Sequence, residues 1–306
     1  MSKRIIFDTL VTEAIRQNGL AALRPVVEKE LLHYDILFCL SEAGLLKSLT
    51  FQGGTSLRLC YNSNRFSEDL DFAGGTEFCS ADLAEMKECI EDYLGNRYGL
   101  EVTVKEPKEL RNEPAYAEVN VDKWQISVTT APERRDIPRQ RIKIEVANVT
   151  AYTRTVRQLV RNYSVLPDGY SDILINVETL DEVMADKLLA FPASTKHIRY
   201  RDMWDLVWLK QQGASLNSAL VSKKLSDYRI EDFREKLQAR IDSLPSIISG
   251  VEFYQEMKRF IPAPVYQNTL GKDGFSLFLQ GTLVELLTQL RKELYETGNT
   301  MDSFVL

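Results

Sequence analysis

The chain has 306 residues, of which 44% are hydrophobic and 27% are charged, a composition typical of a globular protein with one large domain or two. No apolar run approaches the roughly 18 residues that a transmembrane helix requires, and the N-terminus lacks the apolar stretch of a signal peptide, so we expect a cytoplasmic protein without a membrane partner. The net charge of −6 argues against a protein that coats nucleic acid non-specifically.

The side chains that zinc sites and nucleophilic triads need are scarce. The chain has two histidines, His33 and His197, and four cysteines without C-x-x-C spacing. We therefore expect no zinc site and no Ser-His or Cys-His nucleophile, and we expect the cysteines to be reduced core residues. Acid–base chemistry then depends on carboxylates, lysine or metal-bound oxygens.

The predicted elements begin with helices between residues 5 and 47, where apolar side chains recur at spacings of three and four. Residues 49–52 then form a short strand that enters the turn Gly53-Gly54, and residues 55–61 form a helix. A second strand covers residues 69–72. This order of strand, glycine turn, helix and strand brings the glycine turn and the second strand to one sheet edge.

Two carboxylates of the second strand are the first candidate site. A strand has a period of two, so Asp69 and Asp71 lie on one face and Leu70 on the other. Two like charges on one face need a cation, and Mg²⁺, or Mn²⁺ in its place, takes one or two protein carboxylates together with substrate phosphates. The backbone at Gly53 and Gly54 can approach a triphosphate closely, and the N–H groups of the following helix can bind it. Together these residues indicate nucleotidyl transfer from an NTP.

The same residues also allow simpler interpretations. A lone Asp-x-Asp is more often a solvated strand face than a metal site. Calcium is a rival, because Asp69, Asp71 and Gly74 match positions one, three and six of an EF-hand loop. However, Ala73 and Ser80 stand where positions five and twelve require oxygen ligands. The sequence also has neither a P-loop nor a dinucleotide-binding glycine motif.

A helix that starts at Ser80 is predicted next, followed by strands over residues 100–104, 117–121, 124–129 and 141–149. In the last strand, apolar and polar residues alternate, and Glu145 lies on the polar face. Glu145 is therefore our candidate for a third metal ligand, with an ordinary exposed glutamate as the alternative.

A run of basic residues overlaps these strands. It has eight basic residues against two acidic ones, a local charge of +6, and consists of Arg134, Arg135, Arg139, Arg141, Lys143, Arg154, Arg157 and Arg161 with Asp136 and Glu145. A basic strip on an acidic protein is what a local phosphate-binding groove requires. The alternative is a set of surface arginines that pair with acids from other segments.

Residues 180–191 are predicted to form a helix in which Lys187 lies in the middle of the apolar stripe. A lysine there is costly unless it meets an anion, so we predict that Lys187 binds a nucleotide phosphate and has no obligatory partner in the free protein. The alternative is that its amine reaches the surface. Residues 199–210 form another predicted helix, with Asp202 at the edge of its apolar side, and residues 211–306 have helical periodicity without a motif.

The sequence resembles a known family at three places. Gly53-Gly54-Thr55, followed by Arg65-Phe66-Ser67-Glu68-Asp69-Leu70-Asp71, resembles the first motif of the AbiEii/AbiGii toxin-type (MenT-like) nucleotidyltransferases, relatives of DNA polymerase β. The segments DEVMADK and RDMWDL resemble later motifs, whose lysine and aspartate map onto Lys187 and Asp202. Ser67 stands where the family has Ser or Thr. The resemblance covers about residues 50–210 and implies a mixed α/β sheet with flanking helices and metal-dependent transfer of a nucleoside monophosphate.

The resemblance also implies a toxin of a toxin–antitoxin or abortive-infection system, with a cognate antitoxin and tRNA as the modified RNA. We predict an α/β, polymerase-β-like nucleotidyltransferase domain over residues 1–176 and a mainly helical domain over residues 177–306 that contributes Lys187 and Asp202 to the site. The predicted metal ligands are Asp69, Asp71 and Glu145; the nucleotide-binding residues are Gly53, Gly54, Thr55, Ser67 and Lys187; and the catalytic residues are Asp69, Asp71, Lys187 and Asp202.

The predicted reaction is Mg²⁺-dependent transfer of NMP from an NTP to an RNA acceptor, the 3′ end of tRNA. Two alternatives remain open at the level of sequence. The first is the same chemistry with a protein or small-molecule acceptor. The second is a GTP-binding interaction protein with little catalysis.

Overall fold

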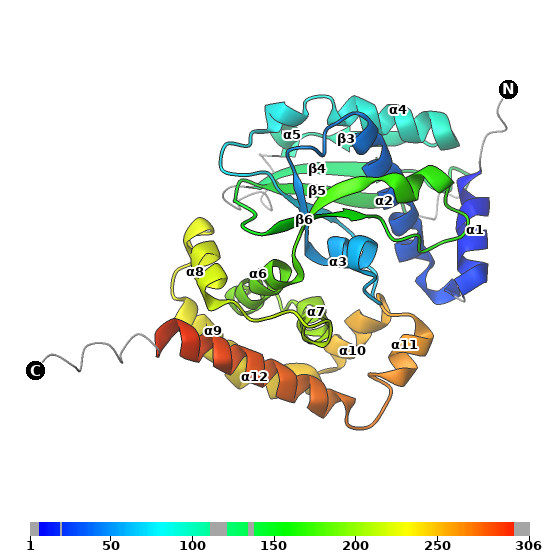
Figure 1. The fold of residues 1–306 in the computed structure, drawn as a ribbon. Helices are drawn as coiled ribbons and strands as arrows, with labels where there is room; N and C mark the ends of the chain where they lie inside the picture. The colour runs from blue at the N-terminus through cyan, green and yellow to red at the C-terminus, as the bar shows by residue number, and fades with distance from the viewer. Residues whose placement is uncertain (1–5, 19, 111–120, 134–137, 297–306) are drawn as a thin grey trace, which may run out of the picture. The chain divides into compact units, whose positions relative to one another are not determined.

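The structure is a computed structural model that describes residues 6–18, 20–110, 121–133 and 138–296 (Figure 1). The chain divides into two compact units, Met1–Glu178 and Thr179–Leu306. No described helix is long and apolar enough to cross a membrane.

The first unit is built on a mixed sheet of seven described strands, as the α/β prediction required. The strands are β1 Thr50–Gln52, β2 Leu70–Ala73, β3 Val102–Lys105, β4 Val121–Val128, β5 Gln140–Ala147, β6 Arg154–Gln158 and β7 Leu174–Glu178. Their order across the sheet is β3-β4-β5-β2-β1-β7-β6. The pairs β2–β5 and β1–β7 are parallel, and the other neighbours are antiparallel.

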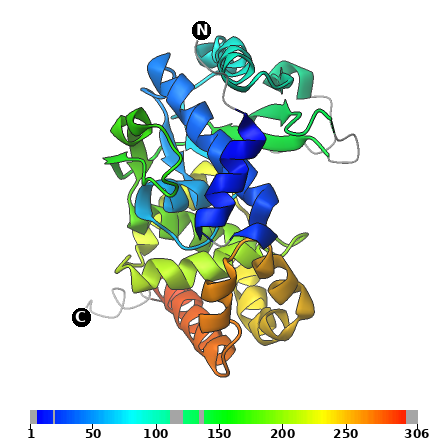
Figure 2. The ribbon, with the colours of Figure 1, turned by 90° about the vertical axis from the view of Figure 1, so that its right-hand side faces the viewer.

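Helices flank this sheet. They are α1 Phe7–Asn18, α2 Arg24–Glu42, α3 Gly53–Tyr61, α4 Met86–Tyr98 and α5 Pro107–Leu110, with short 3₁₀ helices at Ala21–Leu23, Ser80–Leu83 and Asp168–Asp172. Helix α2 packs on α1, α4 and β5, and the view of Figure 2 shows α1 and α2 (blue) side by side. The side chains of Ile142 and Ile144 are fully buried, because alternate residues of β5 point into this core. Phe51 and Phe72 stack between β1 and β2, with ring centroids 5.0 Å apart.

Most sequence-predicted elements of the first unit are present, but strands β6 and β7 were not predicted, and three predictions differ from the structure. Ser80 begins a 3₁₀ helix, and the α-helix starts only at Met86, so the predicted helix was wrong in its first turn. The predicted strand 117–121 lies outside the described residues except for Val121, which begins β4. All four cysteines are free, but Cys79 is exposed, so the prediction of core cysteines was wrong there.

Helices are the only regular secondary structure among the described residues of the second unit. Its helices are α6 Leu180–Ala193, α7 Tyr200–Gln211, α8 Ser218–Asp227, α9 Phe233–Ser249, α10 Val251–Lys258, α11 Ala263–Asn268 and α12 Phe275–Tyr295. Helix α6 packs against α7, α8 and α9, and α12 packs against α9 and α7. Thr179 caps α6, because its side-chain oxygen accepts the N–H of Glu182. Helix α6 runs through Pro192 and ends at Ala193, two residues beyond the end of the predicted helix.

Candidate active site

The glycine turn lies between β1 and α3 and has side chains packed directly against it. Gly53 has φ of +77°, a conformation that L side chains rarely adopt. A Cβ atom added to Gly53 would lie 2.6 Å from Oδ2 of Asp71. At Gly54, a Cβ atom would lie 2.5 Å from Nη2 of Arg65 and 3.0 Å from Oγ of Ser67. The absence of side chains at both glycines therefore lets a carboxylate, a guanidinium and a hydroxyl lie against the backbone.

Helix α3 begins in this turn with its first N–H groups free of a side-chain cap. Gln52 at the N-cap position makes no capping hydrogen bond, and the first turn contains no acidic residue. The first four N–H groups of a helix have no partner within the helix, so they can receive an anion. The buried hydroxyl of Thr55 donates to the backbone carbonyl of Asp69. Thr55 can therefore offer a nucleotide its backbone N–H while its side chain holds the aspartate segment.

Two of the predicted carboxylates are direct neighbours in the sheet. Asp71 of β2 pairs in register with Gln52 of β1 on one side and with Glu145 of β5 on the other. Glu145 in turn lies opposite Lys123 of β4, and Nζ of Lys123 is 3.5 Å from Oε1 of Glu145. Side chains at such positions have Cβ atoms about 5 Å apart. One row across four strands thus reads Gln52, Asp71, Glu145 and Lys123.

Asp69 lies one residue before β2 and is fixed by the neighbouring strand. Its Oδ1 accepts the backbone N–H of Lys143, with an N–O distance of 3.1 Å. The two residues that alternate with the aspartates, Leu70 and Phe72, are fully buried. The alternation predicted from the sequence is therefore present, and Asp69 and Asp71 are half-exposed.

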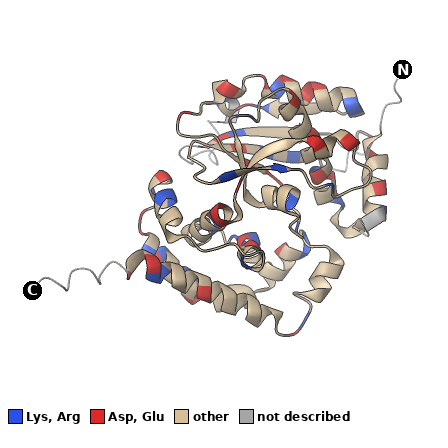
Figure 3. Cartoon of the chain, in the orientation of Figure 1, with Lys and Arg blue, Asp and Glu red and all other residues tan. Residues whose placement is uncertain are grey.

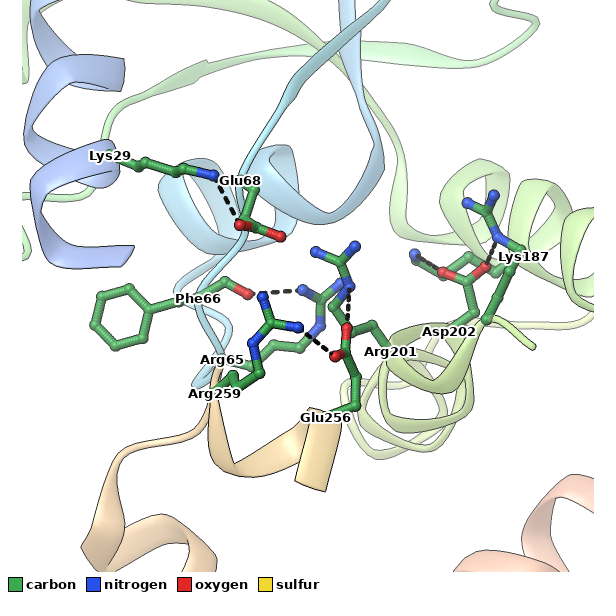
Figure 4. Close-up of polar contacts among 10 residues, drawn as sticks. Lys29, Arg65, Phe66, Glu68, Lys187, Arg201, Asp202, Glu256 and Arg259 are labelled. Carbon is green, nitrogen blue, oxygen red and sulfur yellow. Dashed lines mark hydrogen bonds and ion pairs between the residues drawn. The ribbon is translucent and has the colours of Figure 1, made fainter. Parts of the chain in front are cut away.

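Residues of α2 hold the segment just before Asp69. Nζ of Lys29 lies 2.7 Å from Oε1 of Glu68, and Nε2 of His33 donates to the backbone carbonyl of Glu68 at 2.9 Å. Burial lowers the pKa of His33 to about 4, so the ring is neutral near pH 7. Figure 4 shows the Lys29–Glu68 contact and the hydrogen bond from Arg65 to the carbonyl of Phe66. His33 is thus a buried residue that supports the backbone at Glu68.

The donor atoms in this part of the first unit fit a hard divalent cation. Oε1 of Gln52 is buried and has no hydrogen-bond partner among the described residues, and it belongs to the same row as Asp71. Within the described ranges, no three His, Cys, Asp or Glu side chains are gathered so that they could hold a metal by themselves. Mg²⁺ does not need three such side chains, because it is commonly bound by one or two carboxylates plus substrate phosphates and water. Glu145 as a third ligand stays a prediction, since Lys123 competes for it.

In the second unit, Lys187 of α6 is buried and lies between two carboxylates of α7. Its Nζ is 2.8 Å from Oδ1 of Asp202 and 2.7 Å from Oδ2 of Asp205. Asp202 also binds Arg199, and Figure 4 shows the contact between Asp202 and Lys187. Burial alone would raise the pKa of Asp202, but the charges of Lys187 and Arg199 hold it well below its usual value. The prediction that Lys187 has no partner in the free protein was therefore wrong.

Sequence reasoning missed Asp205 and a second buried ion cluster on α6. Asp202 and Asp205 are three residues apart, so they face the same side of α7 and reach Lys187 together. On another side of α6, Glu182 and Asp186 bind Lys224 of α8, with distances of 2.9 and 2.7 Å from its Nζ. The available signal was the occurrence of acids at spacings of three and four within otherwise apolar helices.

The basic strip of the sequence is divided in the structure. Arg134, Arg135 and Asp136 lie outside the described residues. Arg161 folds onto its own loop, with bonds to Asp168 and to the carbonyls of Ser164 and Leu166. Arg141 and Lys143 lie on β5, whereas Arg154 and Arg157 lie on β6, at the far edge of the sheet. Four strand spacings, about 19 Å, separate β5 from β6. The basic residues of the strip therefore do not gather at one place on the sheet, and their role in binding phosphates stays a prediction.

Comparison with known proteins decides the family. A model described as "Nucleotidyl transferase AbiEii toxin, Type IV TA system" matches residues 35–279. The chain belongs to this AbiEii family. The match spans most of both units and includes every residue that the sequence predicted for the site. The protein is accordingly a nucleotidyltransferase of the AbiEii toxin type, as the sequence motifs predicted.

Solved structures match this AbiEii protein at low similarity. JHP933 from Helicobacter pylori is 16% identical, with a TM-score of 0.45, and the match covers 89% of this chain and 94% of that one. A candidate nucleotidyltransferase from H. pylori is 18% identical, with a TM-score of 0.47 and coverage of 88% and 96%. A STING-associated CdnE c-di-GMP synthase from Capnocytophaga granulosa is 12% identical, with a TM-score of 0.21 and coverage of 94% and 92%. No curated protein matches the chain.

Proposed function

We propose that this AbiEii protein transfers a nucleoside monophosphate from an NTP to RNA in a Mg²⁺-dependent reaction, with the 3′ end of tRNA as the acceptor. The packing of the Asp71 carboxylate against Gly53 supports this proposal most directly. A carboxylate suited to a metal and a glycine turn suited to phosphates thereby share one place in the first unit.

In the proposed reaction, different residues of the first unit bind the phosphates and the cation. The N–H groups at the start of α3 and the hydroxyl of Ser67, beside Gly54, bind the phosphates of the NTP. Asp69 and Asp71 hold the cation, which when bound neutralises phosphate charge and favours deprotonation of the acceptor hydroxyl. The acceptor oxygen bonds to the α-phosphorus, the bond from that phosphorus to the β-phosphate bridge breaks, and pyrophosphate leaves while the hydroxyl proton passes to water.

Lys187 is proposed as a further phosphate-binding group, oriented by Asp202 and Asp205. Two carboxylates hold it in the free protein, so contact with a phosphate requires it to exchange one of these oxygens for a phosphate oxygen. Asp202 already binds Arg199, which can compensate its charge during the exchange. Asp205 keeps the amine in place meanwhile.

Labelling with all four NTPs tests the function. Purified protein is incubated with Mg²⁺ or Mn²⁺, one α-³²P-labelled NTP and total tRNA, and the label is followed into RNA or protein. We expect label in tRNA that is lost with Asp71→Asn. Prior periodate oxidation, which destroys the 3′-terminal diol, should abolish labelling if the 3′ end is the acceptor. Label in protein or in a small molecule instead would reassign the acceptor, and NTP binding without any transfer would favour an interaction protein.

The toxin role implies a cognate antitoxin, and growth provides its test. Expression of the protein should arrest growth, and Asp71→Asn should not. Co-expression of a small neighbouring reading frame should restore growth if that frame encodes the antitoxin. Arrest that persists with Asp71→Asn would show that toxicity does not depend on nucleotidyl transfer.

A further inference from the structure

Strands β3, β4 and β5 have basic side chains on the same face of the sheet as the site carboxylates. The register places Arg141 of β5 opposite Ser127 of β4, and Lys143 opposite Gln125. The next strand adds Thr103 opposite Ser127 and Lys105 opposite Gln125. We call Lys105, Arg141 and Lys143, together with the neutral residues Thr103, Gln125 and Ser127, the cationic face.

The opposite face of the same strands packs into the core. Ile126 and Ile144 are fully buried, whereas Lys105, Arg141 and Lys143 are exposed. Figure 3 marks basic positions (blue) on the strands of this sheet. Neither Arg141 nor Lys143 forms an ion pair with any residue in the part of the chain that the structure describes. These two cations are thus available to an anion from solution.

The cationic face adjoins the carboxylates on one side only. Lys143 lies beside Asp69, since its backbone N–H donates to that carboxylate. The glycine turn lies on the other side, because β1 is the neighbour of β2 away from β5. In nucleotidyl transfer the acceptor attacks the α-phosphorus in line with the departing pyrophosphate, so acceptor and leaving group occupy opposite sides of that phosphorus. With the NTP phosphates at the glycine turn, the acceptor is expected to approach from the side of β5.

We propose that the cationic face binds the phosphate backbone of the acceptor RNA, while the glycine turn binds the NTP. This inference rests on the proposed function and deepens it by placing the acceptor. Strands β3 to β5 span about 10 Å, so the face extends away from the carboxylates. Thr103, Gln125 and Ser127 between them are neutral hydrogen-bonding groups, which suit a sugar–phosphate chain.

Binding of fluorescein-labelled tRNA without NTP tests the face independently of catalysis. We expect Arg141→Gln/Lys143→Gln to weaken binding several-fold, and the slope of log K against log salt to fall by about one for each side chain removed. The backbone bond from Lys143 to Asp69 is retained, so the melting shift induced by NTP and Mg²⁺ should equal that of the wild type. Arg154→Gln is the matched control, because it removes an exposed arginine from the far edge strand β6.

Three results would overturn the inference: tRNA binding by the double variant that equals the wild type, an equal loss with Arg154→Gln, or competition by poly-glutamate that matches competition by unlabelled tRNA. The first two would show that these two cations do not form the site, and the third that the face does not distinguish RNA from any polyanion. If the face binds tRNA as expected but the wild type labels no RNA, the inference holds and the proposed function fails.

Discussion

Nζ of Lys187 lies 2.7 Å from Oδ2 of Asp205, and both groups are buried in the second unit. Replacing Lys187 by Met leaves Asp205 without this counter-charge in a place that water does not reach. We expect the free energy of unfolding to fall by about 3–5 kcal/mol, as for other broken buried pairs. Urea denaturation measures the change.

Lys210→Met is the matched control for that loss. Lys210 also contacts a carboxylate at 2.7 Å, that of Glu285, but both side chains are exposed. Exposed pairs contribute about 0–1 kcal/mol, so this variant should remain close to the wild type. Adding Asp205→Asn to Lys187→Met should recover part of the lost stability. Equal losses for the two lysine variants would contradict the assignment of a buried pair.

Gly53→Ala should abolish transfer and destabilise the first unit. The new Cβ atom would lie 2.6 Å from Oδ2 of Asp71, and φ of +77° is strained for alanine by about 1–2 kcal/mol. Gly75→Ala separates the two effects, because Gly75 has φ of +86° but nothing within 4 Å of an added Cβ atom. We expect Gly75→Ala to show the backbone strain in thermal melts and to keep its activity. Activity of Gly53→Ala near the wild-type level would remove Asp71 from the site.

Asp71→Asn and Asp69→Asn should each lower transfer by more than about 100-fold, the scale on which electrostatic groups act in active sites. The fold should persist, since an amide oxygen at position 69 can still accept the N–H of Lys143. Single-turnover rates with saturating NTP and Mg²⁺ provide the measurement. Glu145→Gln is informative beside them: a smaller effect is expected if Glu145 serves Lys123 rather than the metal.

His33→Gln should change how stability depends on pH. The pKa of His33 is about 4 in the folded protein and about 6.5 when exposed, so between these values the unfolded state binds a proton that the folded state does not. Above pH 6.5 the titration of His33 does not reduce the free energy of unfolding. As the pH falls from 6.5 to 4, it lowers the free energy of unfolding by up to about 3 kcal/mol. Glutamine keeps an N–H donor for the Glu68 carbonyl but does not titrate.

Asp35 changes the pH dependence of stability in the opposite direction. The effect of His33 must therefore be measured as the difference between wild type and His33→Gln. Burial raises its pKa to about 6, so its contribution to stability is present at low pH and is lost as the pH rises from 3.8 to 6. The wild-type curve therefore contains two opposed terms. Urea denaturation of wild type and His33→Gln between pH 4.5 and 7.5 isolates the histidine term as the difference. A difference that does not vary with pH would mean that His33 is accessible to protons in the folded state.

The segment from β1 to β2 could be predicted from the sequence because its signals are local. Glycine at a turn, alternation around Leu70 and a helix after Gly54 each depend on neighbouring residues only. The register that places Glu145 beside Asp71 could not be predicted, since it joins strands about 70 residues apart in the chain. Strands β6 and β7 were not predicted from the sequence. Four of the five residues of β6 are exposed, so it has no alternating apolar pattern.

The partners of Lys187 and the division of the basic strip could not be predicted for the same reason: both depend on contacts between segments distant in the chain. The apolar stripe of α6 correctly placed Lys187 in the interior, but the stripe contains no information about which side chains of α7 face it. Likewise, closeness of the eight basic residues in the sequence does not determine whether they are close in space. The chain passes from β5 at the centre of the sheet to β6 at its edge within seven residues, and this crossing separates the basic side chains.

Strands β1 and β2 lie inside the sheet, and this position protects them from local unfolding. Both strands have hydrogen-bonded neighbours on each side, whereas β6 has one free edge among the described strands. Local unfolding starts where few bonds hold the backbone, so amide protons of β6 should exchange with solvent long before those of Phe51 and Phe72. The carboxylates and the glycine turn are thus attached to the part of the sheet that opens last, and their geometry persists through the smaller fluctuations of the native state.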